Sequence, residues 1–171
     1  MKETEHAVSR SMANYIIREA TSRDFKNIIS IVEKVFNYYR MDLIAQQEVP
    51  DLLDIETHYT RNGTRLFVAE FKDKCLGCSA LHMNNGSTEV KRVYVEPEYW
   101  DSGLDLSLVN YSVCTAKEYG ELCVNHWIDT RFEREQRSFE MLGFVYTGRV
   151  RPLFDINKSY EYHYRKTLNG K

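Results

Sequence analysis

The chain has 171 residues, of which 43% are hydrophobic and 28% are charged, and its formal net charge is −2. These values are typical of one ordinary globular domain with a single core. A slightly acidic chain offers no electrostatic footprint for nucleic acid or an anionic membrane. No apolar run approaches the roughly 18–20 residues that span a bilayer, and the start of the chain lacks the apolar segment of a signal peptide. We therefore expect a cytoplasmic protein.

The first third of the chain predicts a strand followed by helices. Residues 1–13 are polar and aperiodic, so we expect a mobile arm there and a single domain over residues 14–171. The stretch "NYIIREAT" favours a strand, and Thr21 or Ser22 can cap the helix that follows it. A weaker helix is expected near Pro50, since proline suits the first helical position. The first helix is indicated by apolar residues at helical spacing: Phe25, Ile28, Ile29, Val32, Val35, Phe36 and Tyr39.

From Arg65 the hydrophobic period changes to two. The segments "RLFVAEF", "CLGCSALHM" and "STEVKRVYV" alternate as strands do. The polar turn "KDK" joins the first two, and Asn84-Asn85-Gly86 is a strong hairpin signal before the third. The pattern predicts a three-stranded antiparallel meander.

The remaining elements alternate between helix and strand. A helix is expected over about residues 102–119, ended by Gly120 as a left-handed C-terminal cap. The segments "LCVNHWID", "RFEREQRSFEML", "FVYTGRV" and "SYEYHYRKTL" then predict a strand, a helix and two last strands. The strand–helix–strand unit of residues 89–128 should be a right-handed parallel crossover. The whole predicts an α/β domain with a mixed, mostly antiparallel sheet, helices on both faces and a central parallel strand pair.

The sequence "KCLGCSA" contains a Cys-x-x-Cys motif, which can mark a redox pair or half of a zinc site. Cys75 and Cys78 fall on a predicted strand, where residues three apart point to opposite faces. Cys114 and Cys123 add no matching spacing. We therefore expect buried free thiols in a reducing compartment and no metal.

Three stretches together resemble the GNAT acyltransferase superfamily. They are "EVKRVYVEPEYWDSGLDLSL", which is similar to the family's cofactor-binding strand, loop and helix, "FEMLGF", similar to its helix-ending motif, and "YHYRKTL", similar to its closing strand. The resemblance covers residues 15–168 in element order. It implies that acetyl-CoA or another acyl-CoA lies in a V-shaped gap between the two central parallel strands. A primary amine of a small molecule or peptide then attacks the thioester directly, without a metal.

The same resemblance implies where the cofactor binds. A splayed strand edge has unpaired N–H groups that can stabilise the thioester oxygen, and a helix N-terminus favours a diphosphate. The residues so implied are Val93, Tyr94 and Val95 on the strand, and Ser102, Gly103, Leu104 and Asp105 at the start of the helix.

The phosphate loop departs from the family pattern of Arg or Gln, two residues, Gly, one residue, then Gly or Ala. In residues 100–105 only Gly103 is kept, and a basic residue common just beyond is here Leu106. Each carboxylate near a diphosphate costs roughly 1–4 kcal/mol, or about a tenfold to thousandfold loss of affinity. Two interpretations stay open. Either Asp101 or Ser102 caps the helix and Asp105 occupies the phosphate's place, or acyl-CoA binds with its diphosphate displaced or bridged by water.

Two catalytic positions can also be assigned from the resemblance. Phe139 stands where the family often has a tyrosine that protonates the leaving thiolate, and Phe132 stands near a frequent asparagine. Glu89 matches a glutamate that serves as general base, often through water, and should then be partly buried. The alternative is that Glu89 is a solvated residue after a tight turn. His82 and His126 lie on predicted strands, and without metal-ligand spacing we expect satisfied core or rim residues.

The sequence thus predicts an acyl-CoA-dependent N-acyltransferase. The alternative is a catalytically impaired GNAT-like module that binds a ligand or partner, or forms a homodimer through its aromatic-rich C-terminal strands. Transfer from a carrier protein's pantetheine arm would need less of the phosphate loop. Tyr160, Tyr162 and Tyr164 alternate on one face of the last strand, where sheet packing or an acceptor pocket can use them.

Overall fold

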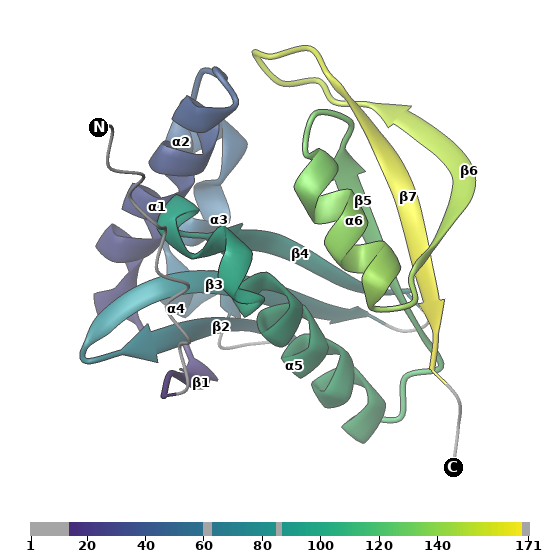
Figure 1. Cartoon of the computed structure of the whole chain (residues 1–171), viewed down its shortest axis with the longest axis horizontal. Coiled ribbons are helices and arrows are strands. Elements are labelled where there is room, and N and C mark those ends of the chain that lie inside the picture. Colours follow the sequence, from purple (N-terminus) through teal and green to yellow (C-terminus); the bar gives the residue numbers. More distant parts are fainter. Residues whose placement is uncertain (1–13, 60–62, 85–86, 169–171) are drawn as a thin grey trace, which may run out of the picture.

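The computed structural model describes residues 14–59, 63–84 and 87–168. Their strands form one sheet in the order β1-β2-β3-β4-β5-β7-β6 (Figure 1). Neighbouring strands are antiparallel except β4 and β5, which are parallel. The predicted mixed sheet with a central parallel pair is therefore confirmed. The strands are β1 (Ile16–Glu19), β2 (Thr64–Phe71), β3 (Lys74–Asn84), β4 (Ser87–Val95), β5 (Cys123–Asp129), β6 (Val145–Pro152) and β7 (Tyr160–Thr167).

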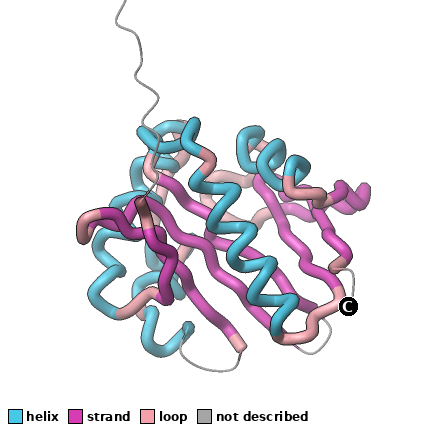
Figure 2. The backbone as a smooth tube through the Cα atoms, turned by 60° about the horizontal axis from the view of Figure 1, so that its bottom comes forward, coloured by secondary structure: helices cyan, strands magenta, loops and turns pink. Residues whose placement is uncertain are grey.

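Helices cover both faces of this sheet, also as predicted. In place of the one weak helix expected near Pro50, the chain forms three short ones. The α-helices are α1 (Phe25–Tyr38), α2 (Ala45–Glu48), α3 (Pro50–Leu53), α4 (Ile55–Tyr59), α5 (Leu104–Glu118) and α6 (Glu133–Met141), and Ser22–Asp24 and Pro97–Ser102 form 3₁₀ turns. Figure 2 shows α5 lying across the strands on the face opposite α1. No helix among the described residues is both long and apolar enough to cross a membrane.

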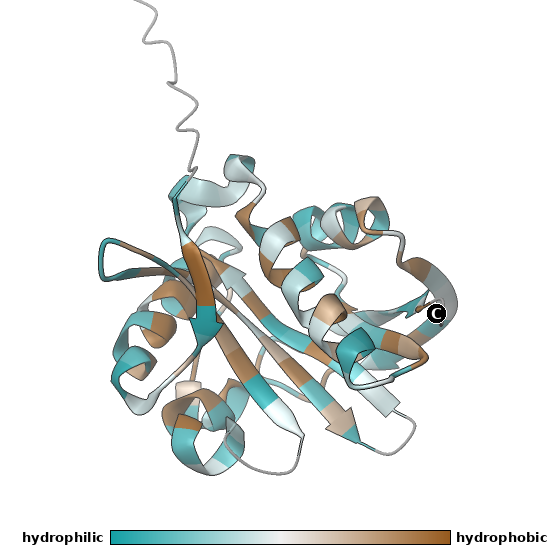
Figure 3. Ribbon diagram, turned by 90° about the horizontal axis from the view of Figure 1, so that it is seen from below, coloured by the Kyte–Doolittle hydropathy of each residue, from teal (hydrophilic) through white to brown (hydrophobic). Residues whose placement is uncertain are grey.

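The period-two pattern of the strands divides the core between the two faces. Leu66 and Val68 of β2 pack in the cluster under α1, whereas Phe67 and Ala69 pack toward α5. The apolar α1 residues predicted from helical spacing form the face of that helix that packs against this cluster. In Figure 3 the hydrophobic residues gather on the strands and on the helices packed against them. Burial on both faces fixes the register of the central strands, because a slip of one residue would exchange the two faces.

A β-bulge changes the predicted geometry of the Cys-x-x-Cys motif. Ala69 pairs with Gly77 but Glu70 pairs with Cys75, so one extra residue is inserted in β3. Cys75 and Cys78 consequently lie in the same cluster beneath α1, and the prediction that they point to opposite faces is wrong. Both are buried free thiols, as expected. Burial raises the pKa of Cys75 to about 11 and also raises that of Cys78.

Tight turns connect the strands of the predicted meander. Lys72 and Asp73 of the "KDK" turn both have positive φ, of 49° and 61°, as a two-residue hairpin turn of type I′ requires. The second predicted hairpin includes residues 85–86, and the expected arm is residues 1–13; both lie outside the described residues.

The feature that positions the site is the junction of β4 and β5. Their parallel register places Glu89 opposite Asn125, and the Asn125 amide donates a 3.1 Å hydrogen bond to the Thr88 carbonyl. A second bulge follows in β4, where Arg92 has a φ of 57°. Beyond this point the two halves of the sheet diverge, as Figure 1 shows. The divergence leaves the facing backbone edges of the two strands free to pair with something else.

Candidate functional site

Two hollows open in the space between the diverging strands. The small hollow, a cavity of about 50 Å³, lies between β4 and helices α5 and α6. The large hollow, of about 510 Å³, lies on the other side, between β4, β5, β7 and the segment around α2. Four residues line both hollows and define what we call the throat: Val93, Tyr94, Phe132 and Glu135. The two hollows thus adjoin at these residues and together form what we call the passage.

The structure brings together the cofactor residues expected on β4 and at the start of α5. Val93, Tyr94, Val95 and Asp105 all line the small hollow. Leu104 is only 1% exposed and packs in the core, so it can offer a ligand only its backbone.

Ser102 and Gly103 form the entrance to α5. The N-cap of the helix is Gly103, which has a φ of 76° and therefore needs a residue without a Cβ. The Ser102 hydroxyl donates to the Tyr99 carbonyl at 2.6 Å and accepts from the Leu104 amide at 3.3 Å. The turn is thus held from within the chain.

Gly103, and not Asp101 or Ser102, takes the N-cap position of α5, so the predicted cap position is wrong. The Ser102 hydroxyl still accepts from the first amide of the helix, that of Leu104, at 3.3 Å. The Asp101 side chain is 99% exposed. The Asp105 carboxylate accepts a hydrogen bond from the Ser138 hydroxyl and so links α5 to α6 across the small hollow.

A cation that the sequence analysis missed lies beside this loop. Arg134, in the first turn of α6, lines the small hollow and reaches back to residues 100 and 101. Its guanidinium donates to the Trp100 carbonyl, lies 3.2 Å from an Asp101 carboxylate oxygen and stands 5.2 Å from the centre of the Trp100 ring. The sequence held one signal for it. An arginine in the first turn of a helix is unfavourable beside the positive end of the helix dipole, which suggests that its side chain has another partner.

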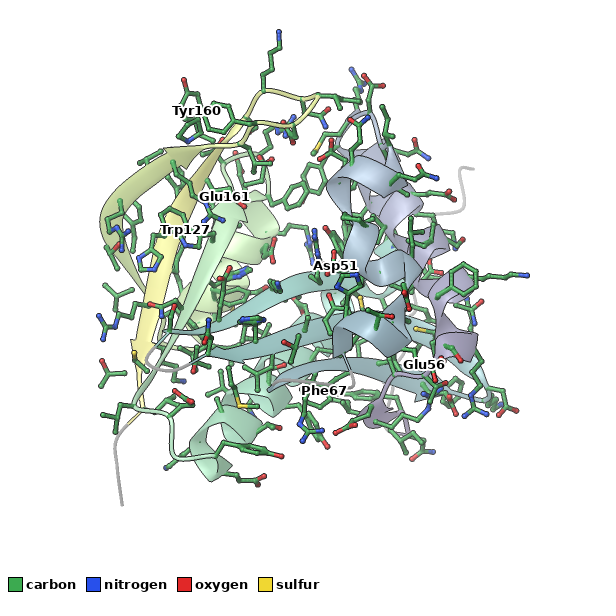
Figure 4. All side chains as sticks on the ribbon, turned by 180° about the vertical axis from the view of Figure 1, so that it is seen from behind. Asp51, Glu56, Phe67, Trp127, Tyr160 and Glu161 are labelled. Carbon is green, nitrogen blue, oxygen red and sulfur yellow. The ribbon has the colours of Figure 1, made fainter. Side chains whose placement is uncertain are left out.

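The large hollow is mainly polar and holds Glu89 at its inner end. Glu89 is half-buried and lies where β4 and β5 still pair. Opposite it, the Arg151 guanidinium stacks 4.1 Å above the Trp127 ring and pairs with Glu161 at 2.5 Å. Figure 4 shows Trp127 and Glu161 on the strand side of the molecule and Asp51 on the helical side.

Arg92 ties the bulge of β4 to the helices beside the large hollow. Its guanidinium donates to both carboxylate oxygens of Asp51, at 2.7 and 3.1 Å, and to the Glu48 carbonyl at 3.0 Å. Burial alone would raise the pKa of Asp51, but the charge and hydrogen bonds of Arg92, with the Tyr59 hydroxyl, hold it below its ordinary value. The pair therefore stays ionised and positions α3 on the sheet.

Aromatic residues close the throat. Phe139, which replaces the family's tyrosine, is fully buried and stacks on the His126 ring with centroids 4.0 Å apart. Phe132 packs 4.7 Å from the Tyr39 ring. Burial raises the pKa of Tyr94 and of Tyr39 to about 12, so both phenols keep their protons at neutral pH.

His126 is a satisfied core residue, as predicted, and His82 shares a hydrogen bond with Thr64 near the end of the β2–β3 ladder. Within residues 14–59, 63–84 and 87–168, no three His, Cys, Asp or Glu side chains gather as metal ligands do.

The fold has counterparts among solved structures. An acetyltransferase from Streptococcus agalactiae aligns with a TM-score of 0.78 at 18% identity, over 92% of this chain and 100% of that one. A Salmonella typhimurium structure that holds its cofactor acetyl-CoA has a TM-score of 0.73 at 18% identity, with 93% and 96% covered. An N-acetyltransferase from Thermoplasma acidophilum in complex with coenzyme A has a TM-score of 0.71 at 12% identity, with 91% and 99% covered. At these identities the likeness shows the fold.

Sequence comparison assigns the family. No curated protein sequence matches the chain significantly. The model of the acetyltransferase (GNAT) family matches residues 32–144, well over half of the chain, and this range runs from α1 through the parted strands to the end of α6. The chain therefore belongs to the GNAT family of acetyltransferases.

Proposed function

We propose that the protein is an acyl-CoA-dependent N-acyltransferase that moves an acetyl group from acetyl-CoA to a primary amine by direct attack. The observation that carries this proposal is the passage between β4 and β5. Its two hollows have different linings and share Val93, Tyr94, Phe132 and Glu135. A thioester in one hollow and an amine in the other can therefore meet in one complex, and such positioning lowers the barrier to their reaction.

The donor would lie along β4 in the small hollow. Val93 and Val95 line this hollow, and their backbone would meet the pantetheine there, although the Val95 carbonyl already accepts from the Trp100 indole N–H at 2.9 Å. An N–H aimed at the thioester oxygen would stabilise its developing negative charge. The diphosphate would lie at the N-terminus of α5, near Gly103. There the helix dipole favours an anion, and Arg134 adds a positive charge that the loop itself lacks.

The acceptor would enter through the large hollow, where Glu89 is the proposed general base. As the amine nitrogen forms its bond to the thioester carbon, Glu89 takes a proton from it through water. The carbon–sulfur bond breaks and coenzyme A leaves with its sulfur protonated. The acceptor is a small-molecule amine or a peptide amine in this proposal.

The first test measures binding of acetyl-CoA through its effect on the melting temperature of the protein. Ligand at a hundred times its Kd stabilises by roughly 2.7 kcal/mol, which for a domain of this size raises Tm by roughly 5–10 °C. The shift should disappear in Gly103→Trp, because a side chain at positive φ strains the loop. Release of free thiol with a panel of primary amines then reports transfer itself.

A second candidate, a GNAT-like module without catalysis, is favoured by one specific observation. The small hollow has only about 50 Å³ of space, and Asp105 adds a carboxylate to it. On this hypothesis acetyl-CoA gives no rise in Tm, even in Asp105→Gly, where the carboxylate is removed. A rise that appears only in Asp105→Gly would instead indicate an enzyme whose donor site is inhibited by its own charge.

A further inference from the structure

The buried imidazole of His126 lies between two hydrogen-bond acceptors. The ring is 3% exposed and projects from β5 into the angle where β4 leaves it. Its Nδ1 is 2.6 Å from the Val90 carbonyl oxygen, and its Nε2 is 2.9 Å from a carboxylate oxygen of Glu135 on α6. Each ring nitrogen therefore faces an oxygen.

These two contacts fix the number of protons that the pair holds. A carbonyl has no proton to give, so Nδ1–H of His126 donates to Val90. The contact between Nε2 and Glu135 then needs one further proton, either on the imidazole or on the carboxyl group. Both arrangements contain one proton more than a neutral histidine beside a free carboxylate does. The geometry therefore requires a shared proton if the contact between Nε2 and Glu135 is a hydrogen bond.

The surroundings keep this proton between the two groups. Glu135 lies in the first turn of α6, where the helix dipole favours a carboxylate and hence an imidazolium partner. Phe139 covers one face of the imidazole at 4.0 Å and excludes water from it. Tyr39 of α1 and Tyr94 of β4 interact electrostatically with Glu135. The charged residues that line the hollows with the pair are Arg134 and Asp105 in the small one and Glu48, Glu89, Lys91, Arg92, Asp129, Arg151, Asp155 and Glu161 in the large one.

The pair also reaches the proposed reaction path. Glu135 is one of the four throat residues, its side chain is 16% exposed, and it lines both hollows. His126 lines the large hollow behind it. Phe139 occupies the family's usual proton-donor position but has no proton to give. Its ring stacks instead on the imidazole of His126.

We propose that the proton shared by His126 and Glu135 is delivered to the thiolate of coenzyme A as it leaves; this inference rests on the proposed function. The amine forms its bond to the carbonyl carbon, the carbon–sulfur bond breaks, and the sulfur takes the proton from the pair. The amine's own proton leaves through Glu89 and water, and the pair recovers a proton from solvent. Glu135 is the catalytic acid that gives the proton to the sulfur. His126 is the positioning residue that holds Glu135 and shares the proton with it.

The chemistry of the alternatives favours this pair. A phenolate holds a proton more tightly than a thiolate does, whereas an imidazole and a carboxylate hold it less tightly. Tyr94 also lines the throat, but burial raises its pKa to about 12, which makes it a weak acid there. Tyr94 is therefore the poorer candidate for the acid.

The first experiment counts protons without using activity. In ¹⁵N- and ¹³C-labelled protein at neutral pH, NMR should show protons on both ring nitrogens of His126, or one on the carboxyl group of Glu135. In Glu135→Gln the side-chain amide can donate to Nε2, so the contact survives, but His126 should retain a proton only on Nδ1. A wild-type His126 with one protonated nitrogen beside an ionised Glu135 would overturn the proposal.

The second experiment measures catalysis in the same variant. Glu135→Gln should lower kcat for thiol release about 100-fold or more while KM for acetyl-CoA changes less than about threefold. The matched control is Glu133→Gln, which removes a carboxylate from the same turn, but one whose side chain is 75% exposed and pairs with Arg137 at the surface. It should leave both constants within about twofold.

The two levels of failure can be separated. If the wild type releases thiol and Glu135→Gln loses less than tenfold in kcat relative to Glu133→Gln, the assignment of the acid is wrong while the acyltransferase function stands. If the wild type neither binds acetyl-CoA nor releases thiol with any amine, the proposed function fails, and the role of the proton fails with it even where NMR finds the proton.

Discussion

At the scale of single residues, the guanidinium of Arg134 offsets the acidic character of the loop at residues 97–105. It lies 3.2 Å from Asp101, whose side chain is almost fully exposed and can exchange that contact for solvent. Because Arg134 also lines the small hollow, a diphosphate there can compete with Asp101 for it. On the proposed function, Arg134 would supply from the neighbouring helix the positive charge that the loop itself lacks.

Arg134→Gln should therefore weaken coenzyme A binding roughly tenfold, or about 1.4 kcal/mol. Asp101→Asn should strengthen binding a few-fold, since it releases Arg134 for the ligand. Isothermal titration at low and high salt measures both effects, which should shrink as salt screens the charges. Arg137→Gln is the matched control because it lies one turn later on the same helix and is 74% exposed. Equal losses in the two arginine variants would contradict the assignment.

The buried thiols give a second prediction at this scale. Burial raises the pKa of Cys75 to about 11, and that of Cys78 is raised as well, so neither forms the reactive thiolate at neutral pH. Iodoacetamide applied to the folded protein should modify Cys114, which is exposed, and spare Cys75 and Cys78. Mass spectrometry of peptides measures this, and in denaturant all of these cysteines should react. Rapid modification of Cys78 in the native state would show that the motif is accessible.

At the scale of elements, the sequence predicts well what depends on local pattern. The stripe of α1, the alternation in β2 and the positive φ of Gly120 after α5 all follow from residue spacing and chain geometry. The start of α5 was misassigned because Gly103 takes the cap position that Asp101 or Ser102 could also have filled. The bulge that puts Cys75 and Cys78 on one face leaves no local mark either.

The parts of the candidate site that escaped prediction are contacts between elements distant in sequence. Arg134 meets Asp101 across 33 residues, and Arg92 meets Asp51 across 41. Neither pair has a spacing that a helix or strand period would reveal. Glu135 is nine residues from its partner His126, but a loop and a change of element separate them. Only the folded sheet and its helices bring such groups together.

The Arg92–Asp51 pair makes a prediction about the α3–β4 junction. Asp51→Asn should lower the free energy of unfolding at neutral pH by about 3 kcal/mol, because it leaves a largely buried guanidinium without its counterion. The pKa of Asp51 is held below its ordinary value, so the pair stabilises fully above the unfolded-state pKa and its contribution is lost as pH falls through the lower folded-state pKa.

Urea unfolding of the wild type and Asp51→Asn measures this linkage. The difference between the two proteins should be full above about pH 5 and should shrink as pH falls below the ordinary aspartate value of about 3.9. Asp42→Asn, an exposed carboxylate before α2, should stay within about 0.5 kcal/mol of the wild type throughout. A difference for Asp51→Asn that grew as the pH fell would have the wrong sign for an ionised pair.

At the scale of the whole molecule, the sheet consists of two halves that meet at a narrow junction. The first half is β1–β4 and the second is β5–β7, joined where Glu89 lies opposite Asn125 and where Asn125 donates to Thr88. Helix α5 packs on the first half of the sheet and helix α6 on the second, and the two helices contact each other. The junction is thus built to leave strand edges open in the middle of a continuous sheet.

Bound acetyl-CoA should therefore slow amide hydrogen exchange locally, along the passage. Protection is expected at residues 93–95 and in the first turns of α5 and α6, because their amides gain a ligand partner or lose access to water. Short labelling times, read by mass spectrometry of peptides, separate this local effect from the general stabilisation that any ligand gives. Peptides from β1, at the far edge of the sheet, serve as the internal control and should exchange equally with and without ligand. Protection in β1 that equals or exceeds that at residues 93–95 would place the ligand outside the parted strands.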